Sequence, residues 1–332
     1  MIIHHLFAFP NRIQKVSYKH IWSINGIPIE QMLGLAGSIC VPIFSFLSGY
    51  GLYVIYKDKV SYRELKHRII NLYKNYWIIF FMFIPLGIFM GVYGFSKKEF
   101  ILNALALRST YNEEWWFLRL YISLILLYPI IIKVVNKYNK YIVLFISFIL
   151  NIIGFKLNEV LIALGINLIS TNILVIVLSG QFIFVLGIVI CKYSIFDKLN
   201  KRIKYSCWKN VLLFIITSVL IVITLNIPSI EEVSKVLLTP IFIFFLNNII
   251  SDNFRCGSFS IHLTNIWLIH SFFCYYLFQK IVFAPKYSIL IFIWTIILSW
   301  ISSIMVNKIL VIINKISLSN KYIESTKNIL NK

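Results

Sequence analysis

Apolar stretches about 20 residues long recur along the chain and are separated by short polar segments. In a stretch such as residues 212–225, LLFIITSVLIVITL, nearly every position is apolar, whereas the strands of a membrane barrel alternate apolar and polar residues. A helix of about 20 apolar residues spans roughly 30 Å of hydrocarbon. The pattern therefore predicts an all-α polytopic integral membrane protein. We expect about ten spans, the first truncated, at residues 1–10, 33–56, 75–95, 115–135, 141–155, 172–192, 210–227, 236–250, 261–283 and 288–313.

The polar segments between the spans are short, so we expect a single transmembrane domain over residues 1–332, with an amphipathic loop at 156–171. Basic residues concentrate at 57–74, 133–140 and 198–209 and in the C-terminal tail, and all of these lie on one side of the membrane if the spans are right. The positive-inside rule makes that side cytoplasmic. We therefore expect a multi-pass protein of the plasma membrane with a cytoplasmic C-terminus.

Composition agrees with this interpretation, since 59% of the residues are hydrophobic and only 13% are charged. The net charge of +20, from 32 basic and 12 acidic residues, would suggest a nucleic-acid partner in a soluble protein. Here the basic residues lie between apolar stretches, where the positive-inside rule and anionic lipid headgroups account for them. We expect membrane lipids as partners and no nucleic acid.

Familiar cofactor and metal signatures are missing from the sequence. The five cysteines have no CxxC spacing, so neither a disulfide framework nor a zinc site is indicated. The sequence contains no P-loop, GxSxG, HExxH or glycine-rich dinucleotide motif. We expect no bound metal and no resident cofactor.

Two adjacent histidines, His4 and His5, lie within the first apolar stretch. An imidazole titrates near neutral pH and can take a proton from a hydroxyl group. The residues alone leave a second interpretation equally open, namely two interfacial histidines that have no role in catalysis.

A second polar group opens the span at 115–135. Glu113 and Glu114 precede Trp115 and Trp116, and Arg119 follows about one turn inside the span. An aromatic belt with snorkelling charges explains the tryptophans. It explains Arg119 less well, because we expect this residue near the outer face.

A third polar group, His262, Asn265 and His270, lies in the apolar stretch FSIHLTNIWLIHSFF. His262 and His270 are eight residues apart and would share one helix face approximately. Their spacing alone favours hydrogen bonds between helices, which contribute about 1 kcal/mol or less each.

Four stretches together resemble the membrane acyltransferase family 3, whose members transfer acyl groups to carbohydrates across the cytoplasmic membrane. HHLFAFP is similar to the histidine segment of the family's first helix, and VPIFSFLSGYGL to its second-helix block. WWFLRLYISLILLYP resembles the block that ends in Y-P, and FSIHLTNIWLIHSFF the block near the C-terminus. The order and spacing of the four stretches carry the resemblance.

The resemblance implies an O-acyltransferase, most simply an O-acetyltransferase, with acyl-CoA as co-substrate and a cell-surface polysaccharide or glycolipid as acceptor. His5, or alternatively His4, would act as base or acyl relay. Lys66 and Arg68 match a basic element that holds acyl-CoA in the family. The remaining candidates, around the substrate pocket, are Ser48, Tyr50, Glu114, Trp116, Arg119 and His270.

The family's basic residue eleven positions before the histidine would fall before Met1, so residues 1–10 supply about half of a first helix. An inactive truncated paralogue is therefore one alternative hypothesis. Another is a transporter or flippase for polysaccharides or lipid-linked sugars, which would also place polar residues inside many spans. Inverted repeats would favour a transporter, and the sequence shows none.

Overall fold

The computed structural model describes residues 1–14, 16–57, 59–164, 173–203, 206–250 and 257–330. Their elements are almost all helical: α1 (Ile2–Phe7), η1 (Pro10–Arg12), β1 (Ser23–Ile24), β2 (Ile27–Pro28), α2 (Ile29–Ala36), η2 (Gly37–Ile39), α3 (Cys40–Tyr56), α4 (Tyr62–Phe89), α5 (Lys97–Ala104), η3 (Glu113–Trp115), α6 (Trp116–Lys137), α7 (Lys140–Ala163), α8 (Ile173–Lys192), α9 (Ile195–Arg202), α10 (Cys207–Thr224), α11 (Glu231–Ile249), η4 (Gly257–His262), α12 (Leu263–Ser271), η5 (Phe272–Tyr276), α13 (Gln279–Val282) and α14 (Ser288–Leu330).

The predicted all-α polytopic membrane fold is confirmed. Eight helical segments of the described residues are long and apolar enough to cross a membrane, and each overlaps one of the spans expected from the sequence. They are Ile29–Tyr56, Tyr62–Phe89, Glu113–Lys137, Lys140–Ala163, Ile173–Lys192, Cys207–Thr224, Glu231–Ile249 and Ser288–Ile316.

The two other expected spans, 1–10 and 261–283, are not continuous helices. Residues 1–10 contain the short helix α1 and, at Pro10, the start of η1. The segment 261–283 is divided into the end of η4, the nine-residue α12, the π-helical η5 and the four-residue α13. The loop expected at 156–171 is also corrected, because α7 continues through Ala163, and residues 165–172 lie outside the described part of the chain.

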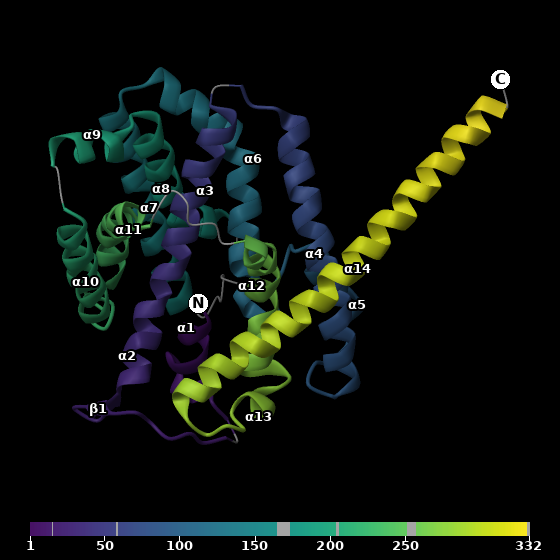
Figure 1. Cartoon of the computed structure of the whole chain (residues 1–332), viewed down its shortest axis with the longest axis horizontal. Helices are drawn as coiled ribbons and strands as arrows, with labels where there is room; N and C mark the ends of the chain where they lie inside the picture. The colour runs from purple at the N-terminus through teal and green to yellow at the C-terminus, as the bar shows by residue number, and fades with distance from the viewer. Residues whose placement is uncertain (15, 58, 165–172, 204–205, 251–256, 331–332) are drawn as a thin grey trace.

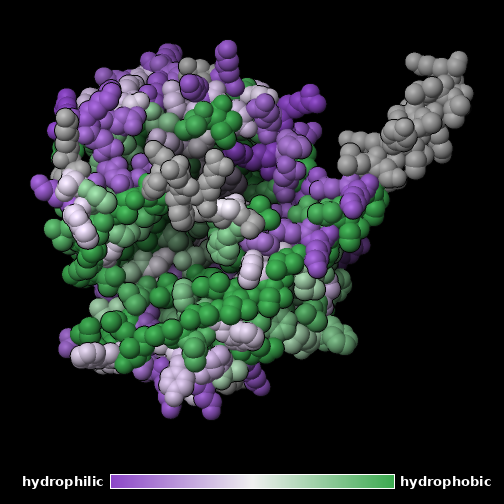
Figure 2. Space-filling model, in the orientation of Figure 1, coloured by the Kyte–Doolittle hydropathy of each residue, from purple (hydrophilic) through white to green (hydrophobic). Residues whose placement is uncertain are grey.

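The spanning helices form one bundle whose two ends carry different elements (Figure 1). Helix α9, the end of α3 and the start of α4 lie at one end of the bundle, while β1 and α13 lie at the other. Helix α14 crosses the bundle obliquely, and its C-terminal half extends away from it. Figure 2 shows an apolar band across the middle of the molecule between more hydrophilic ends.

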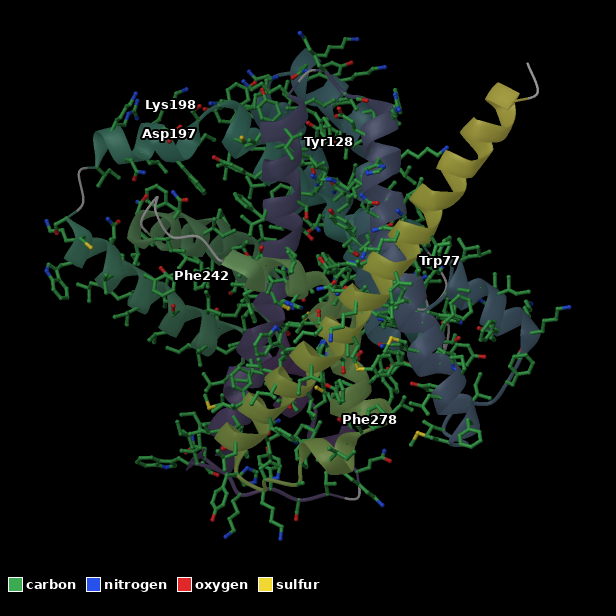
Figure 3. All side chains as sticks on the ribbon, turned by 45° about the vertical axis from the view of Figure 1, so that its right-hand side comes forward. Trp77, Tyr128, Asp197, Lys198, Phe242 and Phe278 are labelled. Atoms are coloured by element: carbon green, nitrogen blue, oxygen red, sulfur yellow. The ribbon has the colours of Figure 1, made fainter. Side chains whose placement is uncertain are left out.

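The side chains labelled in Figure 3 show which residues lie toward each end of the bundle. In Figure 3, Asp197 and Lys198 of α9 lie at one end of the bundle, and Phe278 lies toward the other. Tyr128 of α6 is fully buried and lies toward the same end as Asp197. Trp77, on α4, donates a hydrogen bond from Nε1 to the carbonyl oxygen of Ala104, which ties α4 to α5.

Helices α3 and α8 cross at two glycines, which brings their backbones close together. A Cβ at Gly49 of α3 would overlap the carbonyl oxygen of Phe184, and a Cβ at Gly187 of α8 would overlap the carbonyl oxygen of Phe46. Small residues at such a crossing let membrane helices approach and pack by van der Waals contact. This crossing fixes the position of α3, which lines both cavities described below.

Candidate active site

Helix α1 places the two adjacent histidines inside the bundle. Its Leu6 and Phe7 are 1% exposed and pack in the hydrophobic core. Gly34 of α2 permits this packing, since a Cβ there would lie 2.6 Å from the backbone nitrogen of Ala8. The Nδ1 of His4 is 2.8 Å from the carbonyl oxygen of Gly34 and donates a hydrogen bond to it, so its Nε2 is the nitrogen left to accept a proton.

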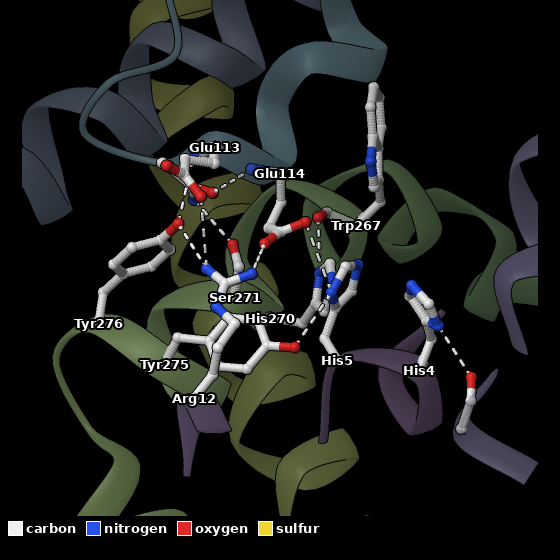
Figure 4. Close-up of polar contacts among 12 residues, drawn as sticks. His4, His5, Arg12, Glu113, Glu114, Trp267, His270, Ser271, Tyr275 and Tyr276 are labelled. Carbon is white, nitrogen blue, oxygen red and sulfur yellow. Dashed lines mark hydrogen bonds and ion pairs between the residues drawn. The ribbon is translucent and has the colours of Figure 1, made fainter. Parts of the chain in front are cut away.

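His5 lies at the meeting point of three segments that are distant in sequence (Figure 4). Its Nδ1 is 3.5 Å from Oε2 of Glu114, at the start of the span that contains α6, and 3.5 Å from the hydroxyl of Tyr275. The ring centroids of His5 and His270 are 4.9 Å apart. A carboxylate that accepts the Nδ1 proton leaves Nε2 free to act as a base.

Arg12, just after α1, holds the carboxylate that faces His5. Its Nη1 donates to Oε1 of Glu114 at 2.7 Å, and its Nη2 donates to the hydroxyl of Tyr276 at 3.1 Å. The guanidinium also lies over the ring of Tyr275, 3.8 Å from its centroid. Burial of Arg12 opposes its charge, but the Glu114 carboxylate, together with Tyr275 and Tyr276, more than offsets this, so the pKa of Arg12 is raised above its usual value.

His270, at the end of α12, is fully buried beside His5. Its Nδ1 donates to the carbonyl oxygen of Trp267 at 2.7 Å, and its Nε2 has no hydrogen-bond partner among the described residues. The π-helix that follows begins at Phe272 and carries Tyr275 and Tyr276. Single π-helical turns often occur at functional sites, and here one brings both tyrosines to Arg12.

Two further hydrogen bonds tie the start of α6 to α12. Nδ2 of Asn112 donates to Oγ of Ser271 at 2.7 Å, and both side chains are fully buried. Nε1 of Trp115 donates to the carbonyl oxygen of Leu268 at 3.0 Å. Glu114 lies between these anchors in sequence and is therefore held at a fixed distance from α12.

A first cavity of about 480 Å³ opens beside His5. Its walls include the side chains discussed above, His4, His5, Arg12, Glu114 and His270. Other polar residues come from helices α7, α8 and α11, namely Asn151, Ser179, Glu231, Glu232 and Lys235. Lys235 is paired with Glu231 at 2.6 Å and with Glu232 at 2.8 Å, so this wall carries both signs of charge.

A second cavity of about 370 Å³ lies against the first. Its polar lining comes largely from α4, with Arg68, Asn71 and Asn75, together with Ser48 of α3 and Thr264 of α12. The two cavities share three lining residues: Phe44, Phe117 and Trp267.

The candidates expected from the sequence divide between the two cavities and the rest of the bundle. His4, His5, Glu114, Trp116 and His270 line the first cavity, and Ser48 and Arg68 line the second.

The other candidates line neither of these cavities. Lys66 is exposed on α4. Tyr50 packs against Phe46 and Phe196. Arg119 is 2% exposed and donates through Nη2 to Oγ of Ser109 at 3.4 Å, away from Glu114.

His262 and Asn265 contact α14 and lie apart from His5. His262 is bonded through Nδ1 to Oγ of Ser303 at 2.8 Å, and Nδ2 of Asn265 donates to Oδ1 of Asn307 at 2.8 Å. These two side chains therefore make the hydrogen bonds between helices that their spacing favoured, whereas His270 belongs to the first cavity.

Arg12, Tyr275, Tyr276 and Lys235 were not among the residues selected from the sequence. Arg12 was detectable in principle, as a basic residue in an outer segment opposite the acidic pair Glu113–Glu114. Among the described residues no group of three His, Cys, Asp or Glu side chains is arranged to hold a metal ion.

Comparison with known proteins identifies a family. The sequence model of a family described as an acyltransferase domain matches residues 1–305, a range that includes every residue lining the two cavities. No curated protein and no solved structure matches the chain.

Proposed function

Because the chain belongs to the acyltransferase 3 family and is a membrane acyltransferase, we propose that it transfers an acyl group, most simply acetyl, from cytoplasmic acyl-CoA to a hydroxyl group of a cell-surface polysaccharide or glycolipid. The observation that carries the proposal is the contact of 3.5 Å between His5 Nδ1 and the Glu114 carboxylate inside the first cavity. A histidine oriented by a carboxylate is a recurrent general base in acyl transfer.

In the proposed reaction, His5 takes the proton of the acceptor hydroxyl on Nε2 while the oxygen attacks the thioester carbonyl. The new C–O bond forms, the C–S bond breaks, and the CoA sulfur leaves with the proton that His5 received. Glu114 accepts the Nδ1 proton of His5 in a hydrogen bond and stabilises the imidazolium. The distance of 3.5 Å is long for this bond, and such bonds commonly shorten when substrate is bound.

The second cavity suits the donor. Arg68, Asn71 and Asn75 supply a cation and amide donors for the phosphates and polar arm of CoA, and Lys66 adds charge at the nearby surface. Guanidinium and ammonium groups form strong charge-assisted hydrogen bonds with phosphate. The first cavity suits a carbohydrate acceptor, because polar groups from α7, α8 and α11 face His5 across it.

We propose that the bundle end bearing α9 is cytoplasmic and that the membrane is the plasma membrane. This end carries Lys57 after α3, Lys137 at the end of α6 and Lys192 at the end of α8, as well as the lysines of α9. The positive-inside rule places such an end in the cytoplasm. The C-terminal end of α14 points the same way in Figure 1, so the C-terminus is cytoplasmic in this proposal.

The test uses the purified full-length chain with labelled acetyl-CoA and membranes that contain candidate acceptors. We expect release of free CoA, transfer of label to surface glycan, and loss of both in His5→Ala. His20→Ala is the matched control, because His20 is exposed and lines neither cavity. A protein that neither binds nor consumes the donor, with surface acetyl content unchanged in His5→Ala, would contradict the proposal. Movement of a lipid-linked sugar without donor consumption would indicate a flippase.

A further inference from the structure

Three aromatic rings separate the two cavities. Phe44 of α3, Phe117 of α6 and Trp267 of α12 each line both of them. The ring centroids of Phe44 and Phe117 are 6.2 Å apart, and those of Phe117 and Trp267 are 5.5 Å apart. The rings therefore form one contiguous apolar partition contributed by three different helices.

The partition stands between two chemically different surroundings. On one side are His5 and Glu114, and on the other is Arg68 with its neighbouring asparagines. A donor that binds its phosphates at Arg68 must bring its thioester carbon past these rings to reach His5. The part of the donor nearest the rings is then the acyl group, which is apolar.

The three rings differ in exposure, from the buried Phe117 to the more open Phe44. Phe117 is 5% exposed, and the ring of Trp267 packs edge-on against it. Phe44 is 40% exposed and lines both cavities. The space beside Phe44 is therefore bounded by the buried ring of Phe117 and by the ring of Trp267 that packs against it.

We propose that Phe44, Phe117 and Trp267 form the acyl-group subsite and that their bulk limits the length of the acyl chain that is transferred. This inference rests on the proposed function. A short acyl group fits between the rings with its carbonyl facing His5. A longer chain meets the rings before the carbonyl arrives. One methylene more or less in an apolar pocket changes selectivity by roughly 10-fold to 200-fold.

The test measures kcat/KM of the purified full-length protein for acetyl-, butyryl- and hexanoyl-CoA, by release of free thiol. Phe44→Ala removes the most exposed ring, and we expect the hexanoyl-to-acetyl ratio to rise at least about 10-fold. Phe44→Trp narrows the same space, and we expect the butyryl-to-acetyl ratio to fall. Phe89→Ala is the control, because Phe89 is 89% exposed and lines neither cavity, and its ratios should equal those of the unaltered protein.

The outcomes distinguish the two proposals. If the unaltered protein turns over none of the donors, both the proposed function and the acyl subsite are wrong. If it turns over acetyl-CoA but both Phe44 variants keep its chain-length ratios, only the acyl subsite is wrong. Trp267→Phe, which keeps an aromatic ring of smaller size, provides a second variant, and an unchanged ratio there would likewise count against the subsite.

Discussion

Arg12 provides a direct test of how the site is organised, because it touches Glu114 and not His5 itself. Replacing it by glutamine removes the bond of 2.7 Å to Glu114 and the cation that faces this carboxylate. The pair is neither fully exposed nor fully buried, since the side chains of Arg12 and Glu114 are 28% and 11% exposed. Exposed ion pairs contribute about 0–1 kcal/mol, and breaking a buried pair costs about 3–5 kcal/mol.

We therefore expect the interaction between Arg12 and Glu114 to contribute an intermediate energy of about 2 kcal/mol. Because this interaction orients the carboxylate toward His5, its loss should raise the activation free energy of acyl transfer by a similar amount, which corresponds to a fall of roughly 30-fold in kcat. Arg12→Lys should lose less of the rate, because an ammonium keeps the positive charge. It should still lose some, because an ammonium cannot bind Glu114 and Tyr276 at the same time as the planar guanidinium does. The assay is the rate of CoA release at saturating donor, with thermal unfolding measured alongside to show that the variant is folded.

Arg108→Gln is the matched control for this experiment. Arg108 also forms an ion pair with a glutamate in an outer segment, at 2.5 Å from Glu99, but it lines neither cavity. We expect Arg108→Gln to keep the original rate. A rate for folded Arg12→Gln within twofold of the unaltered protein would refute the reasoning that Arg12 positions Glu114 for catalysis.

Two further predictions concern the carboxylate and the helix crossing. Glu114→Gln keeps the size of the side chain but removes the anion that faces both His5 and Arg12, so the rate of CoA release should fall about 100-fold or more, further than in Arg12→Gln, which breaks the same ion pair but keeps the carboxylate. In Gly49→Ala the added Cβ would overlap the carbonyl oxygen of Phe184, and we expect a loss of roughly 1–3 kcal/mol, measured as a lower unfolding temperature in detergent. In Gly51→Ala the added Cβ would enter open space, so the unfolding temperature should stay the same or rise slightly. Equal unfolding temperatures for Gly49→Ala and Gly51→Ala would contradict the close crossing of α3 and α8.

The spanning helices could be predicted from the sequence because a bilayer imposes a length and a composition on every segment that crosses it. The segment 261–283 meets the same composition, yet its backbone changes from 3-10 to α to π geometry. Hydropathy counts apolar residues and does not report which carbonyl each amide contacts. The prediction of a continuous span there was wrong for this reason.

Which residue of a motif faces a cavity depends on helix rotation, which the motif does not specify. Ser48 and Tyr50 are two positions apart, about 200° around an α-helix, and only Ser48 lines the second cavity. The same relation holds for Lys66, which is exposed, and Arg68, which lines that cavity. A sequence block can therefore indicate the right helix and still include side chains that point away from the site.

The network around His5 depends on contacts between segments far apart in the chain. Arg12 and Glu114 are 102 positions apart, and Arg12 and Tyr276 are 264 apart. From the sequence, Glu114 was selected because an acid at the entrance to an apolar span needs an explanation. Arg12 and Tyr276 have no such anomaly, since a basic residue in a loop and a tyrosine near a membrane interface are both ordinary.

The rates of acyl transfer by His5→Ala and His4→Ala, measured side by side with the purified full-length protein, test the central claim most directly. Both histidines line the first cavity, but only His5 faces Glu114, and His4 is bonded to the carbonyl oxygen of Gly34 instead. If His5 is the base, His5→Ala should lose about 100-fold or more in kcat and His4→Ala much less. A His5→Ala protein that keeps the original rate, beside a His4→Ala protein that loses it, would contradict the account.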